Sequence, residues 1–358
     1  MNAQFTQHNL IFKQASGTSR GVLTTKETYL LEISENNKKG IGECAIFRGL
    51  SYDDVPDYEE KLTWLCKNIN LDFEVLKKEL LHYPSIIFGL EQALLNLEHG
   101  EDLYFPSDFT DGKDSIKING LIWMGNADFM QSQIEEKLAK GFDCIKLKIG
   151  VDWKSEKEII KKLREKFPKE QLELRVDANG AFSYEEASMV LQELADLGIH
   201  SIEQPIKKSE VRSPKSEENS EKKSTDCCIP WNKMARLCAE TPTPIALDEE
   251  LIGIIDFEEK KKLLETIKPQ YIILKPALVG GFSGSDEWIA IAESLGINWW
   301  ITSALESNIG LNAICQYTYT KKNPLPQGLG TGALFTNNFE THLQLEGDQM
   351  WHKKTPYY

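Results

Sequence analysis

Three consecutive segments decide the fold: CIKLKIG at residues 144–150, SEKEIIKKLREKF at 155–167 and LELRVDAN at 172–179. The outer two are short, apolar and contain β-branched residues, which is typical of buried strands. The middle one has the apolar spacing of an amphipathic helix. Strand, helix and strand in this order indicate two parallel strands joined by a right-handed crossover.

The same alternation extends in both directions along the chain. The candidate strands lie at 115–123, 144–150, 172–179, 201–205, 244–249, 271–279, 298–307 and 326–332. Helical patterns fill most of the intervals, and eight such units fit a closed barrel better than an open sheet. We therefore predict an α/β fold whose main domain, residues 111–332, is a (β/α)8 barrel of the TIM type.

The first 110 residues follow a different pattern. Short strands are expected at 10–14, 28–34 and 40–47, and helices at 58–69 and 84–100. This mixture predicts a separate α+β domain over residues 1–110. The C-terminal tail, residues 333–358, is expected to pack back onto that domain.

One segment interrupts the barrel pattern after its fourth strand. KKSEVRSPKSEENSEKKSTD at 207–226 consists largely of Ser, Lys and Glu and has no apolar period. Such a segment cannot bury enough surface to offset the entropy lost on ordering. We predict a flexible insertion, either a solvated loop or a lid over the barrel mouth.

Composition excludes several kinds of partner and location. The 358 residues include 41 Lys and Arg against 55 Asp and Glu, a net charge of −14 that disfavours nucleic acids and anionic membranes. No apolar run approaches the roughly 20 residues of a membrane span. The seven cysteines contain no C-x-x-C pair, and the N-terminus has no signal-peptide pattern. We expect a cytoplasmic protein that acts on small molecules.

Carboxylates end three successive candidate strands. Asp177 closes the third strand, Glu203 the fourth and Asp248 the fifth. Any one of them alone is explained as a helix N-cap, but three at matching depth converge in a barrel. Converging carboxylates require a cation, and an all-oxygen set without His or Cys favours Mg²⁺, with Mn²⁺ as the alternative.

Lysines bracket these carboxylates. Lys146 and Lys148 are two residues apart on the second strand, so they share a face, and Lys275 ends the sixth strand. Lys148 and Lys275 would therefore face each other across the metal. A lysine beside a divalent cation is pushed towards its neutral form and can act as a base, while the metal stabilises the charge left by proton removal.

The motifs K-L-K, R-V-D-A-N, I-E-Q-P, L-D-E and L-K-P, in this order on consecutive strands, resemble the lysine-pair branch of the enolase superfamily. This branch is similar to the muconate-lactonising enzymes in layout. The resemblance implies the following roles: Asp177, Glu203 and Asp248 as metal ligands, Lys148 as acid and base, Lys275 as the enolate-stabilising group or opposite base, Lys146 as a neighbour that tunes Lys148, and Asn179 near the metal.

The resemblance also covers the N-terminal domain and the choice of base. It implies that residues 1–110 form a capping domain, whose loops at 16–21 and 40–53 close over the substrate. Another branch uses a histidine on the seventh strand. Among the six histidines only His200 lies in the barrel region, and it precedes the fourth strand, so a histidine base is excluded.

Two segments bear on the substrate. TSALESNIGL at 302–311 ends the seventh strand and opens a helix, whose amides together with Ser303 and Ser307 can hold a carboxylate; ordinary N-capping is the competing explanation. GLGTG at 328–332 lacks the D-x-D pair of the superfamily's dipeptide epimerases, which leaves a substrate ammonium without a partner. The resemblance thus implies a dicarboxylate without an amine and a hydro-lyase reaction, the elimination of water.

Three alternatives remain open from the sequence. The same site suits racemisation or cycloisomerisation of a related substrate. Lys148 or Lys275 could instead form a Schiff base, as in lysine-dependent aldolases. Outside enzymes, the barrel could be a small-molecule binding protein, although two lysines and three mutually repelling carboxylates have little purpose there.

Overall fold

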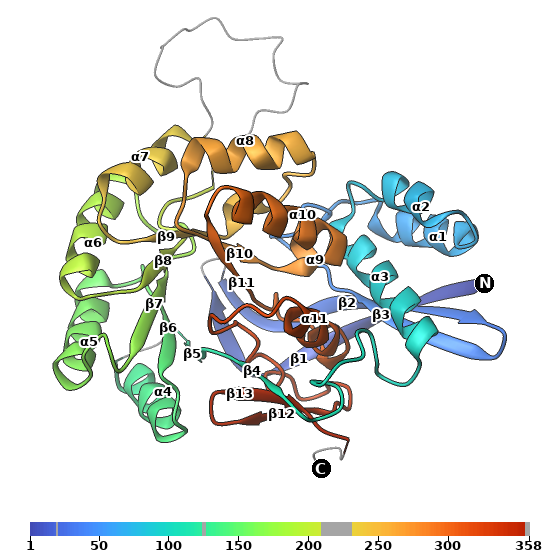
Figure 1. Ribbon diagram of the computed structural model, residues 1–358, viewed down its shortest axis with the longest axis horizontal. Coiled ribbons are helices and arrows are strands. Elements are labelled where there is room, and N and C mark those ends of the chain that lie inside the picture. Colours follow the sequence, from blue (N-terminus) through green and yellow to red (C-terminus); the bar gives the residue numbers. More distant parts are fainter. Residues whose placement is uncertain (19–20, 124–126, 209–230, 355–358) are drawn as a thin grey trace, which may run out of the picture.

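The computed structural model describes residues 1–18, 21–123, 127–208 and 231–354. It contains a curled parallel sheet surrounded by helices and, beside it, a smaller antiparallel sheet with its own helices (Figure 1). The predicted architecture, an α/β barrel with an α+β capping domain, is confirmed.

Seven parallel strands form the barrel sheet in the order β11-β10-β9-β8-β7-β6-β5. Their bounds are β5 Gly120–Ile122, β6 Cys144–Lys148, β7 Glu173–Asp177, β8 Ser201–Glu203, β9 Ile245–Leu247, β10 Tyr271–Leu274 and β11 Asn298–Ile301. Gln327 forms a parallel bridge with Ile118 and Gly328 forms one with Thr302. The two edges of the sheet are thus joined, and the barrel closes.

Helices follow the strands and cover the outside of the sheet (Figure 1). They are α4 Ala127–Ala139, α5 Trp153–Lys166, α6 Tyr184–Asp196, α7 Asn232–Glu240, α8 Phe257–Ile267, α9 Pro276–Val279, α10 Gly281–Ser294 and α11 Asn308–Thr320, with a 3₁₀ turn η2 Glu249–Leu251 after β9. In α5, Ile159, Ile160 and Leu163 are buried, which confirms the amphipathic pattern. Ser183 and Glu186 start α6 with a capping box.

Four barrel-strand predictions need correction, and the first is the strand predicted at 298–307, which ends at Ile301. Residues 115–123 are not one strand, because β4 (Ser115–Lys117) pairs with a C-terminal strand while β5 pairs with β6. The strand predicted at 271–279 ends at Leu274, since Pro276 starts α9. The eighth strand, predicted at 326–332, consists only of the two bridges at Gln327 and Gly328.

The capping domain is a three-stranded antiparallel sheet with helices packed on it. Its strands are β1 Asn2–Thr18, β2 Gly21–Glu35 and β3 Lys38–Cys44, and its helices are α1 Tyr58–Asn68, α2 Phe73–Glu79 and α3 Pro84–His99. A Cβ on Gly40 or Gly42 would lie about 2 Å from a carbonyl oxygen of α3. Only glycine allows β3 and α3 to approach this closely, which fixes the helix against the sheet.

The C-terminal tail contacts two parts of the molecule. Residues 334–336 exchange backbone hydrogen bonds with β1, and β12 (Leu343–Glu346) and β13 (Gln349–His352) form a sheet with β4. The domain boundaries at 110 and 332 remain predictions. Residues 19–20 of the first predicted capping loop and residues 209–226 of the predicted insertion lie outside the described residues.

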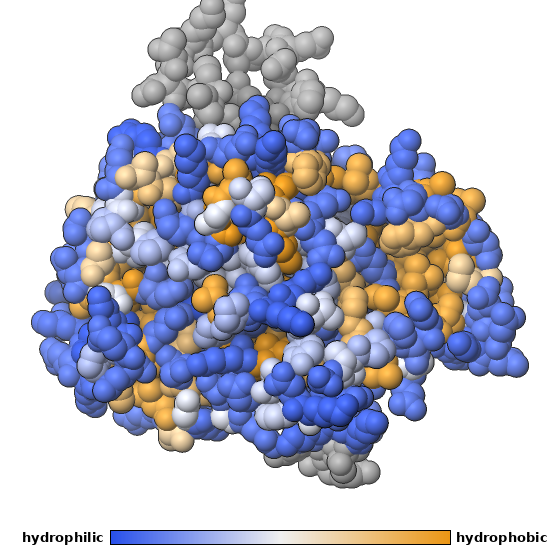
Figure 2. All heavy atoms as spheres, in the orientation of Figure 1, coloured by the Kyte–Doolittle hydropathy of each residue, from blue (hydrophilic) through white to orange (hydrophobic). Residues whose placement is uncertain are grey.

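The molecular surface is largely polar, as the composition leads one to expect. The face in Figure 2 is mostly hydrophilic, with hydrophobic atoms gathered mainly over the capping domain at the right. Within the described residues, no helix combines the length and the apolar character that crossing a membrane requires.

Candidate active site

Three buried carboxylates gather at the carboxyl ends of neighbouring strands. Asp177 is the last residue of β7, Glu203 is the last of β8, and Asp248 directly follows β9. Asp177 and Glu203 are paired in register, so they lie at the same depth. Each is at most 2 % exposed. The three residues thus stand at the ends of neighbouring strands, as the sequence predicted, and their joint binding of a metal remains a prediction.

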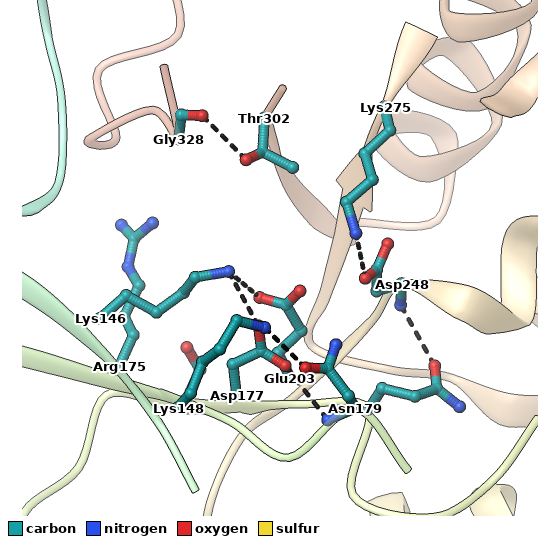
Figure 3. A network of polar contacts seen from close by, with 12 residues as sticks. Lys146, Lys148, Arg175, Asp177, Asn179, Glu203, Asp248, Lys275, Thr302 and Gly328 are labelled. Atoms are coloured by element: carbon teal, nitrogen blue, oxygen red, sulfur yellow. Dashed lines mark hydrogen bonds and ion pairs between the residues drawn. The ribbon is translucent and has the colours of Figure 1, made fainter. Parts of the chain in front are cut away.

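Lysine ammonium groups lie against these carboxylates from two sides (Figure 3). From β6, Lys146 Nζ is 3.1 Å from Asp177 Oδ2 and 2.7 Å from Glu203 Oε2, and Lys148 Nζ is 3.1 Å from Asp177 Oδ2. From the end of β10, Lys275 forms an ion pair with Asp248. Strands β7, β8 and β9 separate β6 from β10, so the carboxylates lie between the lysines.

The electrostatics of the cluster are strongly coupled. Burial would raise the pKa of Asp177, but the ammonium groups of Lys148 and Lys146 outweigh it and hold that pKa below its usual range. Burial would lower the pKa of Lys275, but the carboxylate of Asp248 outweighs it and raises that pKa. Burial, together with the charges of Glu249 and Glu203, opposes ionisation of Asp248, and the ammonium group of Lys275 counteracts this effect. The negative charge near Asp248 is therefore incompletely balanced.

Asn179 and Gln204 hold the cluster in place. Asn179 Oδ1 accepts a hydrogen bond from Lys148 Nζ at 2.6 Å, and its Nδ2 donates to Glu249 at 3.1 Å. Gln204 Oε1 accepts from the amides of Asp248 and Glu250, both at 3.2 Å. Gln204 belongs to the quoted I-E-Q-P motif, but no role was predicted for it, because its partners lie more than 40 residues away in the chain.

Arg175 shares the inner face of β7 but does not reach the cluster. Its guanidinium lies 4.2 Å from the centre of the Trp300 ring, and its Nη1 donates to Pro326 O at 2.9 Å. It fills the barrel interior below the carboxylates.

The donor set fits a hard divalent cation. Glu203 Oε1 is fully buried and has no hydrogen-bond partner, and a buried carboxylate oxygen without a partner is costly unless a cation satisfies it. All three candidate ligands offer oxygen, which Mg²⁺ prefers. The neighbouring lysines already neutralise part of the carboxylate charge, so the cluster can exist before a metal arrives.

A cavity opens above the cluster, and both domains line it. Phe47 and Leu50, from the predicted capping loop at 40–53, form one wall. They pack on Ile252, Leu278 and Ala304 of the barrel. The barrel contributes polar groups and an apolar wall: Asn119, Leu121, Trp123, Thr302, Ser303 and Thr331. Among these, only Ser303 was predicted from the sequence.

The two predicted serines have different surroundings. Ser303 lines the cavity, but its hydroxyl donates to Glu306 at 2.5 Å and accepts from Thr331 at 2.8 Å. Its substrate contact remains a prediction. The prediction that Ser307 contacts the substrate needs correction. Ser307 is fully buried, and its amide and hydroxyl both donate to Glu43 of the capping domain.

The N-terminus of α11 therefore binds a carboxylate, but one that belongs to the chain itself. The amide of Gly310 also donates to Glu43, at 3.0 Å. Ser307 additionally caps the helix through Ile309 N, as the competing explanation had it. The sequence could not indicate this, because Glu43 is 264 residues away from Ser307.

Comparison with known proteins agrees with this geometry. Residues 130–216 and 226–351 match the family model described as enolase C-terminal domain-like. The chain is 41 % identical over 380 residues to o-succinylbenzoate synthase from Desulfotalea psychrophila, an alignment that covers 97 % of this chain and 98 % of that protein. The chain belongs to the enolase superfamily.

Two further similarities within the enolase superfamily differ in extent. The crystal structure of MenC from Desulfotalea psychrophila matches with a TM-score of 0.83 and 39 % identity, over 98 % of this chain and 99 % of that one. The N-succinylamino acid racemase of Thermus thermophilus is 33 % identical over 177 residues, which is 49 % of this chain and 40 % of that protein. The superfamily resemblance predicted from the motifs is confirmed.

Proposed function

We propose that this chain catalyses the Mg²⁺-dependent dehydration of 2-succinyl-6-hydroxy-2,4-cyclohexadiene-1-carboxylate to 2-succinylbenzoate, the o-succinylbenzoate synthase reaction of menaquinone biosynthesis. The observation that carries the proposal is the 41 % identity to an o-succinylbenzoate synthase over nearly the full length of both chains. The cluster of carboxylates between lysines supports it, because the reaction begins by removing a weakly acidic proton next to a carboxylate. The enzyme would then be a carbon–oxygen hydro-lyase.

Asp177, Glu203 and Asp248 would hold the Mg²⁺. When bound, the metal supplies stabilisation of the negative charge that the substrate carboxylate acquires as its α-proton leaves. Asp177 and Glu203 are the last residues of β7 and β8, and Asp248 directly follows the end of β9. Such placement keeps ligand positions rigid.

Lys148 would move the proton. Asn179 and Asp177 fix its ammonium nitrogen by hydrogen bonds of 2.6 and 3.1 Å. In its neutral form this nitrogen accepts the α-proton, and as an ammonium it then donates a proton to the departing hydroxyl. One C–H and one C–O bond break, a C=C bond forms, water leaves, and the ring becomes aromatic. A single base on one face of the ring therefore suffices for this syn elimination.

Lys275 would act from the opposite side. Its ion pair with Asp248 keeps it charged, since Asp248 raises its pKa against the effect of burial. A fixed ammonium facing the substrate stabilises the enolate without exchanging a proton. Lys146 contacts Asp177 and Glu203 and would limit the charge of the metal ligands.

The test is conversion of the diene substrate by purified protein with Mg²⁺, followed by absorbance and by identification of 2-succinylbenzoate. Lys148→Ala is expected to lower kcat by about 10²–10⁴-fold, the usual contribution of general acid–base catalysis. Lys140→Ala, at an exposed ion pair on the end of α4, is the matched control and should keep full activity. Absence of conversion by the wild-type protein contradicts the proposed reaction, whereas an active Lys148→Ala contradicts only the assigned base.

Racemisation of an N-succinylamino acid is the second candidate activity. The observation that favours it is the presence of lysines on both sides of the carboxylates, because inversion needs a base on one face and an acid on the other. Incubation of N-succinyl-L-amino acids in D₂O separates the two activities. Racemisation gives the D-isomer with deuterium at Cα. If the site performs dehydration alone, no D-isomer forms and no deuterium enters the amino acid.

We also propose that the protein acts in the cytoplasm on this small dicarboxylate. The described cysteines, Cys44, Cys66, Cys144, Cys238 and Cys315, are all free thiols, which suits a reducing compartment.

A further inference from the structure

Three side chains of types that bind metals, Asp102, His342 and His352, converge at a place that does not line the cavity at the barrel mouth. Asp102 Oδ2 lies 2.5 Å from His342 Nδ1 and 3.1 Å from His352 Nε2. One ligand atom from each residue lies within 4.8 Å of the other two. The two imidazole rings are 5.3 Å apart, centre to centre. None of these residues takes part in the proposed reaction.

The backbone fixes all three residues before any ligand binds. Asp102 O accepts hydrogen bonds from Asn312 and Gln316 of α11, at 2.9 and 2.8 Å. His352 is the last residue of β13 and pairs with Leu343 at the start of β12. His342 O accepts from Lys353 N at 2.8 Å. Three separate chain segments therefore present their side chains to one point.

Exposure differs among the three side chains in a way that suits an ion site. The His352 side chain is 3 % exposed, while those of Asp102 and His342 are each 30 % exposed. The point of convergence is thus enclosed on one side and reachable from solvent on the other. An ion can enter from the open side, and water can complete its coordination there.

We propose that Asp102, His342 and His352 form a second metal site, which binds Zn²⁺. Two imidazoles and one carboxylate are borderline ligands that suit Zn²⁺ and disfavour Mg²⁺. Zn²⁺ at about 2.0–2.1 Å from each ligand atom would separate neighbouring ligands by slightly more than 3 Å, so small side-chain rotations adapt the present distances. A solvent molecule is the fourth ligand of the tetrahedron.

The site would join the C-terminal hairpin to the rest of the molecule. β12 and β13 contact β4 at the lower edge of the view in Figure 1, and Asp102 lies in the segment between α3 and β4. A metal bound to all three side chains closes a loop of about 240 residues, because Asp102 and His342 are that far apart in the chain. Its role is structural, since binding to the folded state alone raises stability.

Hydrogen bonds alone are the competing explanation. In that case both imidazoles donate to the Asp102 carboxylate. Burial would raise the pKa of Asp102, but the hydrogen bonds and charge interactions with His352 and His342 outweigh burial and lower that pKa. Such a network needs no metal and binds Zn²⁺ only weakly. The two explanations therefore differ in a measurable affinity.

The test is titration of the full-length, tag-free protein with Zn²⁺ in the presence of saturating Mg²⁺, which occupies the barrel carboxylates. We expect one Zn²⁺ per chain and a higher Tm with Zn²⁺. His342→Gln and, separately, Asp102→Asn should weaken Zn²⁺ binding by more than the roughly 10–100-fold that loss of an outer partner costs. His82→Gln, at a histidine outside the cluster, is the matched control and should bind as the wild type does.

Co²⁺ provides a measurement that does not depend on the variants. Bound to two imidazoles in a tetrahedral site, it gives intense visible bands, whereas octahedral oxygen ligation gives weak ones. Glu203→Gln, which alters the barrel carboxylates, should retain these bands, and His342→Gln should lose them. Weak bands in the wild type, or equal Zn²⁺ affinity in the wild type and His342→Gln, would overturn the proposal.

Discussion

Two regions of the molecule bury carboxylates, and they satisfy them in opposite ways. At the barrel mouth, Asp177 and Asp248 contact lysine ammonium groups. At the interface between the domains, Glu43 accepts hydrogen bonds from amides and hydroxyls at the start of α11, and Glu91 accepts from the amides of Phe282 and Ser283 at the start of α10.

The difference separates a reactive site from a structural contact. Amides at a helix N-terminus are held by the backbone, so their positions are fixed and a cation cannot displace them from the carboxylate that they bind. Lysine side chains are long and rotate, so an incoming cation can displace them from a carboxylate. Glu203 Oε1, the buried oxygen without a hydrogen-bond partner, belongs to the carboxylates that contact lysines at the barrel mouth. The identity of the donor, rather than burial, thus distinguishes the two regions.

Metal removal should separate the regions most strongly. Dialysis against EDTA is expected to lower dehydratase activity by about 10³-fold or more, because the metal contributes several kcal/mol of charge stabilisation. Mg²⁺ alone should restore it. Activity that survives EDTA would contradict the metal role of the lysine-paired carboxylates, and Glu203→Gln should require far more Mg²⁺ than the wild type.

Loss of Lys275 is the next largest effect. Lys275→Met should lower kcat by about 10²–10³-fold, as removal of one group that stabilises a developing oxyanion does, with little change in the circular dichroism spectrum. Lys262→Met, on the exposed face of α8, is the control. Equal kcat values in the two variants would show that the opposite side of the cluster is not needed for dehydration.

Glu91 should make the domain interface sensitive to pH. Burial raises its pKa from 4.5 to about 7, against the hydrogen bonds from Ser283 and Phe282. Between these values the folded state binds a proton that the unfolded state has lost, so stability falls as pH rises from 4.5 to 7, by about 3 kcal/mol. Glu91→Gln should lack this decrease.

Urea unfolding of the wild type and of Glu91→Gln at pH 4.5, 6 and 7.5 measures this contribution. The difference in stability between the two proteins should shift in favour of the variant as the pH rises. A difference that stays constant over the three pH values would mean that Glu91 is already ionised at pH 4.5 in the folded protein.

The smallest effect is expected at Glu43. Glu43→Gln leaves fewer acceptors for Ser307 and Gly310 and should lower the free energy of unfolding by about 1–3 kcal/mol. Glu35→Gln, whose side chain is half exposed, should change it by less than about 1 kcal/mol. If Glu43→Gln lowers kcat strongly while the free energy of unfolding stays unchanged, Glu43 contributes to the reaction rather than to the contact between the domains.

The sequence predicted those features that depend on local pattern. Asp177, Glu203, Asp248 and the lysines were found because each stands at the end of an apolar strand, and parallel strands in a barrel end at one mouth. The end of α3 at Gly100 was likewise evident from the residues around it. For these positions the neighbouring sequence determines the location.

Features that depend on distant partners were missed. The amides at the start of α11 were expected to bind the carboxylate of a substrate, but those of Ser307 and Gly310 donate to Glu43 of the other domain. Residues 115–123 appeared to be one strand, and only the position of β13, more than 200 residues later, divides them. The convergence of Asp102 with His342 was invisible for the same reason. In each case the deciding contact joins segments whose proximity exists only in the folded chain.

The bridges at Gln327 and Gly328 also have a consequence for synthesis of the chain on the ribosome. They join the first and last strands of the barrel, so a nascent chain that ends before residue 327 has seven strands and two unpaired sheet edges. Unpaired edges promote association with other chains. Translation that stops between residues 303 and 327 would therefore yield aggregation-prone fragments, although such fragments already contain every residue assigned to catalysis.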